Sequence, residues 1–336
     1  MIRPHKRTLV TAFAAALLAV LVGLIPAAAT PRVAAAPANF SVPNGPPACP
    51  SGVAYVNHAA TGTNTGVSWA NAFTSLQSAL NPTCGIVDEI WVAHGVYTPG
   101  ITYSDTFKVK PNVGLYGGFA GTETTRDERD WVANVTVLSG DIGGDDITDA
   151  NGVVTTPADI RGTNAYHVVW MDGKTTGAMD MLTRLDGFVI TGGKGSGVNP
   201  GDGTGGGVYC DGHGGTGYCS PWIVNVILSG NQSGRGGGMY NYGNTGGVAS
   251  PALINVTFTG NTATVDGGGL YNDGTNYGES NPALINVTFT GNQAAGAGGA
   301  MYNNASDGGK SKPNLRYVTF YSNTSATYGG AIYNIS

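Results

Sequence analysis

A period of 31 residues runs through the C-terminal part of the sequence, residues 205–336. Five copies of a Gly-Gly-x-x-Tyr phrase occur there, and their tyrosines lie 31 residues apart: Tyr209, Tyr240, Tyr271, Tyr302 and Tyr333. A second phrase follows each of the first four copies, at 221–231, 251–261, 282–292 and 313–323, and its most regular form is PALINVTFTGN. Self-similarity at such a period is typical of solenoids, in which each unit buries its apolar face against its neighbours. The repeat therefore predicts a stack of equivalent units.

The chemistry of each unit predicts strands and turns. The second phrase is rich in β-branched and aromatic residues and is bounded by Pro and by Gly-Asn, which is typical of a β-strand. The sequence holds 55 glycines, and a glycine inside a helix costs about 1 kcal/mol relative to alanine. Strands that recur in one direction at a fixed period pair in parallel and in register. We therefore expect an all-β fold, a single parallel β-helix.

This register stacks equivalent side chains in columns. The expected apolar columns are Val208, Met239, Leu270, Met301 and Ile332; Ile223, Leu253, Leu284 and Leu315; and Leu228, Phe258, Phe289 and Phe320. A fourth column consists of Asn225, Asn255 and Asn286, which we expect to form a ladder of amide hydrogen bonds at a bend. Tyr317 replaces the asparagine in the last copy, so the ladder is expected to end there.

Residues 53–204 lack the 31-residue period but contain strand-like segments of similar sequence. The segment LDGFVITGG at 185–193 aligns with the second phrase of the repeat, with Ile190 in the position of Phe258. Further strands are expected at 89–93, 106–109, 113–116, 135–138 and 166–171, and an excursion from one rung at 140–165. In segment 68–81, apolar side chains fall on one helical face, which predicts an N-terminal capping helix over the open end of the coil. We therefore expect a cap and irregular rungs at 53–204, followed by regular rungs at 205–336.

The N-terminus has the pattern of an export signal. Arg3, Lys6 and Arg7 precede an uncharged run at 8–25 and then an alanine-rich stretch, so residues 1–36 are interpreted as a signal peptide and processing region, and 37–52 as a linker. The alternative is an uncleaved membrane anchor; no other segment is apolar enough to span a membrane. Without its first 36 residues the chain carries 12 basic and 21 acidic residues. This balance argues against a nucleic-acid partner.

Four cysteines follow the signal: Cys49, Cys84, Cys210 and Cys219. An even number in an exported chain favours two disulfides, although four cysteines allow three pairings. Bonds between Cys210 and Cys219 and between Cys49 and Cys84 would close a repeat loop and fasten the N-terminal segment. Free or partly paired thiols are the alternative.

Several motifs resemble known families. The phrases GGAMY at 298–302 and GGAIY at 329–333, with FxxN phrases at 258–261, 289–292 and 320–323, resemble the polymorphic outer-membrane-protein repeat (GGAI/FxxN). Segments 68–80, 88–99, 115–131 and 185–193 resemble bacterial right-handed β-helix proteins of the pectin-lyase-like superfold. The resemblance covers nearly all of residues 53–336. It implies a right-handed coil that is secreted or lies on the bacterial surface, in the outer membrane or cell envelope.

The sequence departs from many such relatives at Ser336, where it stops after the fifth copy without a cap or an anchor. An uncovered rung is an edge that invites strand pairing. The expectation is a fragment of a longer chain or end-to-end self-association.

Candidate metal ligands gather before the repeats. Asp141, Asp145, Asp146 and Asp149 lie close together, and oxygen ligands at such spacing suit Ca²⁺. A solvated polar loop is the alternative. Within the repeats five acids occur, at Asp211, Asp266, Asp273, Glu279 and Asp307, and only Asp273 and Asp307 are expected to stack loosely. The histidines are isolated in the sequence, and His167 is interpreted as structural.

Two classes of function fit these observations. The first is an adhesin-like or structural surface protein without catalysis, with an extracellular polysaccharide or a surface protein as its partner. The second is a polysaccharide lyase or glycoside hydrolase, for which the resemblance to the pectin-lyase-like superfold implies a Ca²⁺ held by carboxylates and a basic residue acting as base. The repeated positions are explained by stacking and turning, so the first class is preferred, and any chemistry is expected before residue 205. The fold itself decides nothing, because it hosts both classes.

Overall fold

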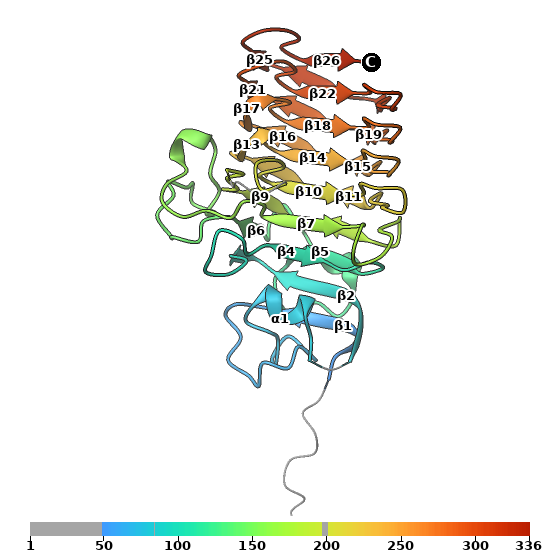
Figure 1. Cartoon of the computed structure of the whole chain (residues 1–336). Helices are drawn as coiled ribbons and strands as arrows, with labels where there is room; N and C mark the ends of the chain where they lie inside the picture. Colours follow the sequence, from blue (N-terminus) through green and yellow to red (C-terminus); the bar gives the residue numbers. More distant parts are fainter. Residues whose placement is uncertain (1–48, 84, 197–200) are drawn as a thin grey trace, which may run out of the picture. The chain divides into compact units, whose positions relative to one another are not determined.

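The computed structural model describes residues 49–83, 85–196 and 201–336 (Figure 1). They belong to one compact unit, Pro46–Ser336. The expected signal at 1–36 and residues 37–48 of the expected linker lie outside the described residues. Strand β1 (Ser51–Val56) begins two residues before position 53, where the cap and irregular rungs were expected to start. Within the described ranges, no helix is long and apolar enough to cross a membrane.

Four sheets run along the coil, and all of their strand pairs are parallel. The first sheet contains β1, β2 (Ile86–Ala93), β5 (Gly114–Phe119), β8 (Arg184–Asp186), β11 (Trp222–Val224), β15 (Ala252–Ile254), β19 (Ala283–Ile285) and β23 (Asn314–Arg316). The second contains β4 (Phe107–Val109), β7 (Val169–Asp172), β10 (Val208–Asp211), β14 (Met239–Tyr242), β18 (Leu270–Asp273), β22 (Met301–Asn304) and β26 (Ile332–Ile335).

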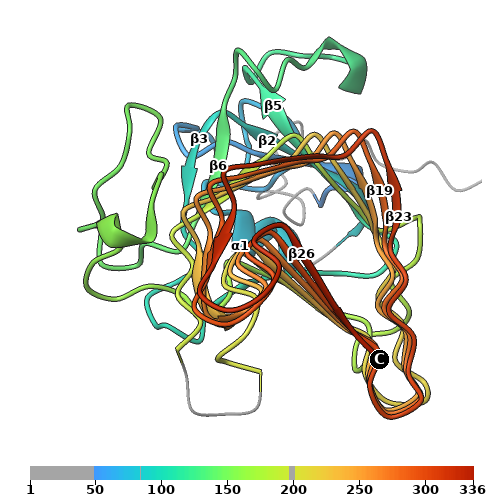
Figure 2. The ribbon, with the colours of Figure 1, turned by 90° about the horizontal axis from the view of Figure 1, so that it is seen from above.

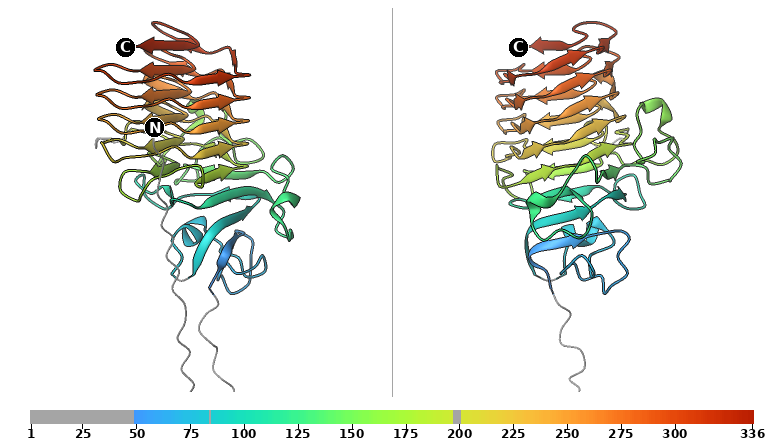
Figure 3. Two further views of the ribbon diagram at one scale, coloured as in Figure 1. Left: turned by 90° about the vertical axis from the view of Figure 1, so that its right-hand side faces the viewer. Right: turned by 180° about the vertical axis from the view of Figure 1, so that it is seen from behind.

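The third sheet contains β3 (Gly95–Tyr97), β6 (Thr136–Ser139), β9 (Val189–Thr191), β12 (Ile227–Ser229), β16 (Thr257–Thr259), β20 (Thr288–Thr290) and β24 (Thr319–Tyr321). The fourth contains β13 (Gln232–Arg235), β17 (Thr262–Asp266), β21 (Gln293–Ala294) and β25 (Thr324–Ser325). The rungs stack as successive layers (Figure 3), and along the coil the repeated rungs superimpose (Figure 2). The parallel β-helix expected from the period is confirmed.

The predicted apolar columns are also confirmed. Met239 pairs with Leu270, Leu253 with Leu284, and Phe258 with Phe289 in the register of the strands. The rings of Phe258 and Phe289 stack with their centroids 4.6 Å apart, and both side chains are fully buried. Ile190 and Phe258 lie in one column through Leu228, which joins the irregular rungs to the regular ones.

The backbone conformation of the bend between the first and third sheets explains why asparagine recurs at this position. Asn225, Asn255 and Asn286 adopt φ values of 53°, 55° and 54°, and Gly187 takes the equivalent place one rung earlier with φ 83°. Asparagine tolerates this left-handed region better than most residues with a Cβ. The side chains also bond to one another: Nδ2 of Asn255 donates to Asn225 Oδ1 at 3.1 Å, and Nδ2 of Asn286 to Asn255 Oδ1 at 2.9 Å.

Two further amide ladders lie in the interior, and the sequence interpretation missed them. One consists of Asn231, Asn261, Asn292 and Asn323, and the other of Asn241, Asn272, Asn303 and Asn334. Their side-chain hydrogen bonds are 2.7–3.0 Å long. The sequence does contain the pattern that predicts them, because both sets of asparagines recur with the 31-residue repeat. A buried amide that pairs with its equivalents in the neighbouring rungs satisfies its donor and its acceptor together.

The helix predicted over 68–81 is wrong in extent. Among the described residues, the only α-helix is α1 (Leu76–Leu80), with Ser75 as its N-cap, and two short 3₁₀ turns occur at Arg126–Glu128 and Pro157–Asp159. Phe73 pairs with β1 instead: its N–H donates to Tyr55 O at 2.8 Å and its carbonyl accepts from Asn57 N at 2.8 Å. The exposed edge of β1 takes a backbone partner that a helix could not supply. Leu76 and Leu80 are buried in the main core, while a capping role for α1 stays a prediction.

Candidate binding groove

The acidic loop before the repeats brings three of its four aspartates together. Carboxylate oxygens of Asp141, Asp145 and Asp146 can all lie within 4.8 Å of one another, but Asp149 is not part of this group. Asp149 accepts hydrogen bonds from the backbone N–H groups of Asn151 and Val153 in its own turn. The Asp141 carboxylate likewise accepts three backbone N–H bonds, from residues 144, 145 and 146. Turn formation thus explains much of this cluster, and the Ca²⁺ site stays a prediction.

Two of the three arginines that a lyase mechanism could use near these carboxylates pair with other acids. Arg126 pairs with Glu89 at 2.5 Å, and Arg129 pairs with Asp186 at 2.8 Å. Arg161 contributes its backbone N–H to Asp146, at 2.6 Å from Oδ1. No ion pair joins the aspartate cluster to an arginine within the described ranges, although Arg161 adjoins it through its backbone.

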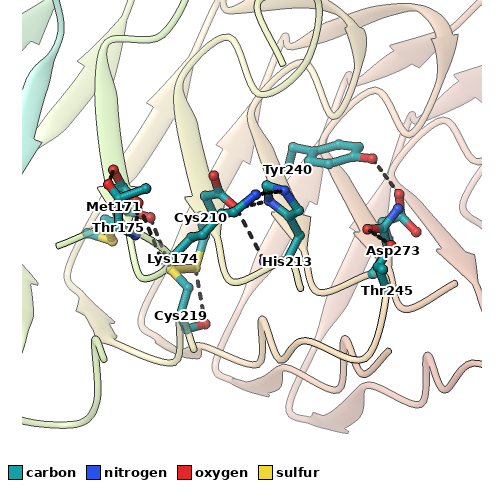
Figure 4. Close-up of polar contacts among 12 residues, drawn as sticks. Met171, Lys174, Thr175, Cys210, His213, Cys219, Tyr240, Thr245 and Asp273 are labelled. Carbon is teal, nitrogen blue, oxygen red and sulfur yellow. Dashed lines mark hydrogen bonds and ion pairs between the residues drawn. A yellow bond between two sulfur atoms is a disulfide. The ribbon is translucent and has the colours of Figure 1, made fainter. Parts of the chain in front are cut away.

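Cys210 and Cys219 form a disulfide with Cα atoms 5.8 Å apart. Cys49 is disulfide-bonded as well, and its expected partner, Cys84, lies outside the described residues. The Cys210–Cys219 bond closes the loop that carries Asp211 and His213 (Figure 4).

A groove of about 430 Å³ runs across the outer face of the second sheet, at the junction of the irregular and regular rungs. Its size is within the range of small-ligand sites. Strands β7, β10, β14 and β18 and the loops around them line it with rings and ionisable groups, chiefly His167, Trp170, Lys174, Asp202, Tyr209, Asp211, His213, Tyr240, Tyr242 and Asp273. A larger groove of about 530 Å³, beside Thr155–Ala158, has no ionisable residue in its lining. The first groove is therefore the candidate site.

A pattern of a ring followed two residues later by an aspartate recurs on the strands of this groove. It occurs as Trp170 and Asp172 on β7, Tyr209 and Asp211 on β10, and Tyr271 and Asp273 on β18. The strand register aligns Trp170 with Tyr209 and Asp172 with Asp211. On β14 the corresponding residues are Tyr240 and Tyr242. Alternate residues of a strand point to the same face, so rings and carboxylates form two adjacent columns on the outside of the coil.

These columns correct one expectation and add two contacts that it did not cover. Asp273 does not stack on Asp307; it aligns with Asn304 on one side and, through Tyr242, with Asp211 on the other. Asp172 and Asp211 lie side by side on neighbouring strands, so acids do stack where the two regions of the coil meet. His167 and His213, which are distant in the sequence, line the same groove. The pattern W-x-D, Y-x-D, Y-x-D could have been found by comparing the rung of β7 with the repeats.

The first aspartate of the column is already neutralised. Lys108 Nζ lies 2.9 Å from Asp172 Oδ2 and 4.5 Å from the centroid of the Trp170 ring. Burial alone would raise the pKa of Asp172, but hydrogen bonds from Thr175 and the charge of Lys108 outweigh it and hold the pKa below its usual value. Asp172 is thus a buried, ionised counter-ion for the Lys108 ammonium.

The second aspartate orients a histidine. The Asp211 carboxylate lies 2.6 Å from His213 Nδ1, and Lys174 Nζ contacts His213 Nε2 (Figure 4). A lysine ammonium can only donate, so Nε2 accepts and Nδ1 carries the proton that it donates to Asp211. The lone pair that would make His213 a general base is therefore occupied by Lys174.

The third aspartate has no cation beside it. Tyr240 Oη donates to Asp273 Oδ2 at 2.6 Å, and Thr275 donates through its N–H and its hydroxyl. Burial, followed by the charge of Asp273, raises the pKa of Tyr240, which keeps the phenol protonated as the donor. No lysine, arginine or histidine in the described residues forms an ion pair with Asp273.

Rings form the floor of the groove. Tyr209 stacks on His167 at 4.9 Å between centroids and on Tyr240 at 5.9 Å. Tyr242 lies above them, tilted against His213 at 4.6 Å. Burial lowers the pKa of His167, although its hydrogen bond with Gly205 O opposes this. Trp170 and Tyr242 are half-buried and present ring surface to the groove, whereas Tyr209 and Tyr240 lie beneath.

Two segments of the chain match the family model of the Chlamydia polymorphic membrane protein repeat, residues 255–273 and 317–335. The first contains Phe258 and Tyr271 and the second contains Phe320 and Tyr333, so the match falls on two of the units found from the sequence. By its description, this repeat is found in polymorphic membrane proteins of Chlamydia. No curated protein and no solved structure matches the chain. The resemblance to the pectin-lyase-like superfold stays a prediction.

Proposed function

We propose that this chain is a secreted or surface-exposed β-helix that binds an extracellular polysaccharide in the groove on β7, β10, β14 and β18, without catalysing a reaction on it. The polymorphic-membrane-protein type of repeat supports the location. The groove supports the ligand class, because it combines half-buried ring surfaces with side chains that form hydrogen bonds. Sugar rings offer C–H faces to aromatic rings and hydroxyl groups to polar side chains.

The observation that carries the preference for binding over catalysis is the bonding of His213. Its Nδ1–H is directed at Asp211 and its Nε2 is held by Lys174, so the imidazole has no free lone pair. Asp172 is paired with Lys108, and Asp273 accepts bonds from Tyr240 and Thr275. General acid–base catalysis needs a group that is free to exchange a proton with the substrate.

Glycoside hydrolysis is the second candidate, and one observation favours it. Asp172 and Asp211 align on adjacent strands, whose backbones lie about 4.8 Å apart. Retaining glycosidases use two carboxyl groups about 5 Å apart. Incubating the purified chain with a panel of neutral and uronic-acid polysaccharides, with and without Ca²⁺, would separate the candidates. Release of oligosaccharides that is lost in Asp211→Asn would favour hydrolysis.

Binding itself is tested by calorimetry with oligosaccharides on two tyrosine variants. Tyr242→Ala removes a ring from the groove and is expected to weaken binding about tenfold. Tyr242→Phe keeps the ring and should bind normally. Tyr321→Ala is the matched control, because Tyr321 is exposed on β24 of a different sheet. Equal affinities of all four proteins would contradict the assignment of the groove.

A further inference from the structure

We propose that the groove selects saccharides that carry amino groups in their ammonium form, and discriminates against uronic acids. This inference rests on the proposed function and names the chemical class of its ligand. It follows from the repeated pattern of a ring and an aspartate, from the charge of the lining, and from an ammonium group that the coil already holds in the first copy of the pattern.

The first copy shows what the pattern binds. On β7 the Lys108 ammonium lies 2.9 Å from the Asp172 carboxylate and 4.5 Å from the centre of the Trp170 ring. A carboxylate and a ring face, placed two residues apart on one strand, thus hold an organic ammonium by an ion pair and a cation–π contact. Lys108 comes from β4, the neighbouring strand of the same sheet.

The later copies have the same acceptors without a lysine on their carboxylates. Asp211 aligns with Asp172, and its partner in the structure is the imidazole of His213. Asp273 is 7% exposed, lines the groove, and receives bonds only from the neutral groups of Tyr240 and Thr275. A carboxylate withdrawn from water and not paired with a cation is costly, and an incoming ammonium would offset that cost.

Tyrosine rings lie beside Asp273 in the groove. Tyr242 is half-buried between Asp211 and Asp273 in the strand register, and Tyr240 touches Asp273 through its hydroxyl. The negative face of an aromatic ring attracts an organic cation and gives nothing to a carboxylate. One rung further, the guanidinium of Arg235 lies 5.9 Å from the Tyr271 ring, a second cation on the same column of rings.

The charged residues that line the groove also favour a cationic ligand. Three carboxylates line the groove, Asp202, Asp211 and Asp273, against one lysine. That lysine, Lys174, is held at His213 Nε2. A uronic acid would bring another carboxylate into this field, whereas an amino sugar would bring the opposite charge.

The test compares three oligosaccharides of equal length on the full chain by calorimetry at low salt. They are an oligomer of glucosamine, its fully N-acetylated counterpart, and an oligomer of galacturonic acid. We expect the glucosamine oligomer to bind about tenfold more tightly than the N-acetylated one, and the advantage to shrink as salt is added. Binding of the uncharged or acidic oligomer with equal or higher affinity would overturn the charge selectivity and leave saccharide binding intact. Binding of none of the three would overturn both.

Two variants that each remove one negative charge test whether the selectivity for the ammonium form arises at Asp273. Asp273→Asn keeps an acceptor for Tyr240 and Thr275 and removes the charge, so it should weaken binding of the glucosamine oligomer about tenfold and reduce its advantage over the N-acetylated oligomer. Asp307→Asn changes the net charge equally at an exposed site outside the groove and should change neither affinity. Equal effects of the two variants would overturn the role of Asp273. The comparison of oligomers on the unaltered chain holds even if Asp273→Asn does not fold.

Discussion

Among the described residues, five ion pairs join a lysine or arginine to an acid, and four of them lie before position 205. The most buried group is Asp186, which is fully buried and contacts Arg129 at 2.8 Å and Arg184 at 2.7 Å. In the regular rungs after 205, three amide ladders take the place of most such pairs. The two regions belong to one coil and share its sheets, yet their polar groups are satisfied by different chemistry.

The difference follows from self-similarity. In a repeat, each side chain lies against its own kind in the next rung. An amide carries a donor and an acceptor and can therefore bond to another amide, whereas a carboxylate that meets a carboxylate is repelled. In the irregular rungs unlike residues meet, so acids can face bases. The boundary is visible at Asn225, whose Nδ2 donates to Asp186 Oδ1 at 2.9 Å.

The largest expected effect lies in the irregular region. Asp186→Asn leaves the guanidinium of Arg129, which is 9% exposed, without its counter-ion. Breaking one partner of a buried ion pair costs about 3–5 kcal/mol, so the free energy of unfolding should fall by that amount. Urea unfolding followed by circular dichroism measures it. Asp127→Asn, at an exposed position, is the control. A loss no larger than that of the control would mean that the charges of this region do not stabilise it.

A smaller effect is expected from an amide of the regular region. Asn261→Ala removes the acceptor for the Asn231 N–H groups, at 3.0 Å, and the donor to Leu228 O, at 2.9 Å. Buried groups left unpaired cost about 1–3 kcal/mol, which the same urea experiment would detect.

The outer ladder supplies the matched control for Asn261. Asn255 is exposed and has a positive φ, so Asn255→Gly removes an amide without backbone strain and should cost less than about 1 kcal/mol. If the two variants were equally unstable, burial of the inner ladder would not be what makes it stabilising.

The smallest expected effect is a change in the pH dependence of stability, and it involves His167 at the junction of the two regions. Burial lowers the pKa of His167 in the folded chain, and its hydrogen bond with Gly205 and the charges of Asp202 and Asp211 oppose this. The unfolded chain then binds a proton more readily, so stability is full above the unfolded pKa of about 6.5 and is lost as pH falls from there toward the folded value. His167→Gln should flatten this part of the profile of melting temperature against pH. An unchanged slope would mean that other groups carry it.

Sequence patterns predicted the apolar columns and the outer asparagine ladder where neighbours are equivalent, but the two interior amide ladders with the same period were missed. The columns through Phe258, Phe289 and Phe320 and the ladder through Asn225, Asn255 and Asn286 follow from counting in steps of 31, because identical rungs can only align identical residues. The helix predicted at 68–81 from the spacing of apolar residues was wrong in extent, because Phe73 pairs with β1 instead.

The sequence by itself determined the parallel coil, its period, its inward columns and the bends that asparagine occupies, since these depend on local propensity and on repetition. Only the tertiary structure decided which unlike residues meet. Asp172 forms an ion pair with Lys108, and Asp186 forms one with Arg129. The groove combines residues that lie between His167 and Asp273 in the sequence. Such contacts depend on which unlike residues the irregular rungs and their loops bring together, and no periodic rule fixes them.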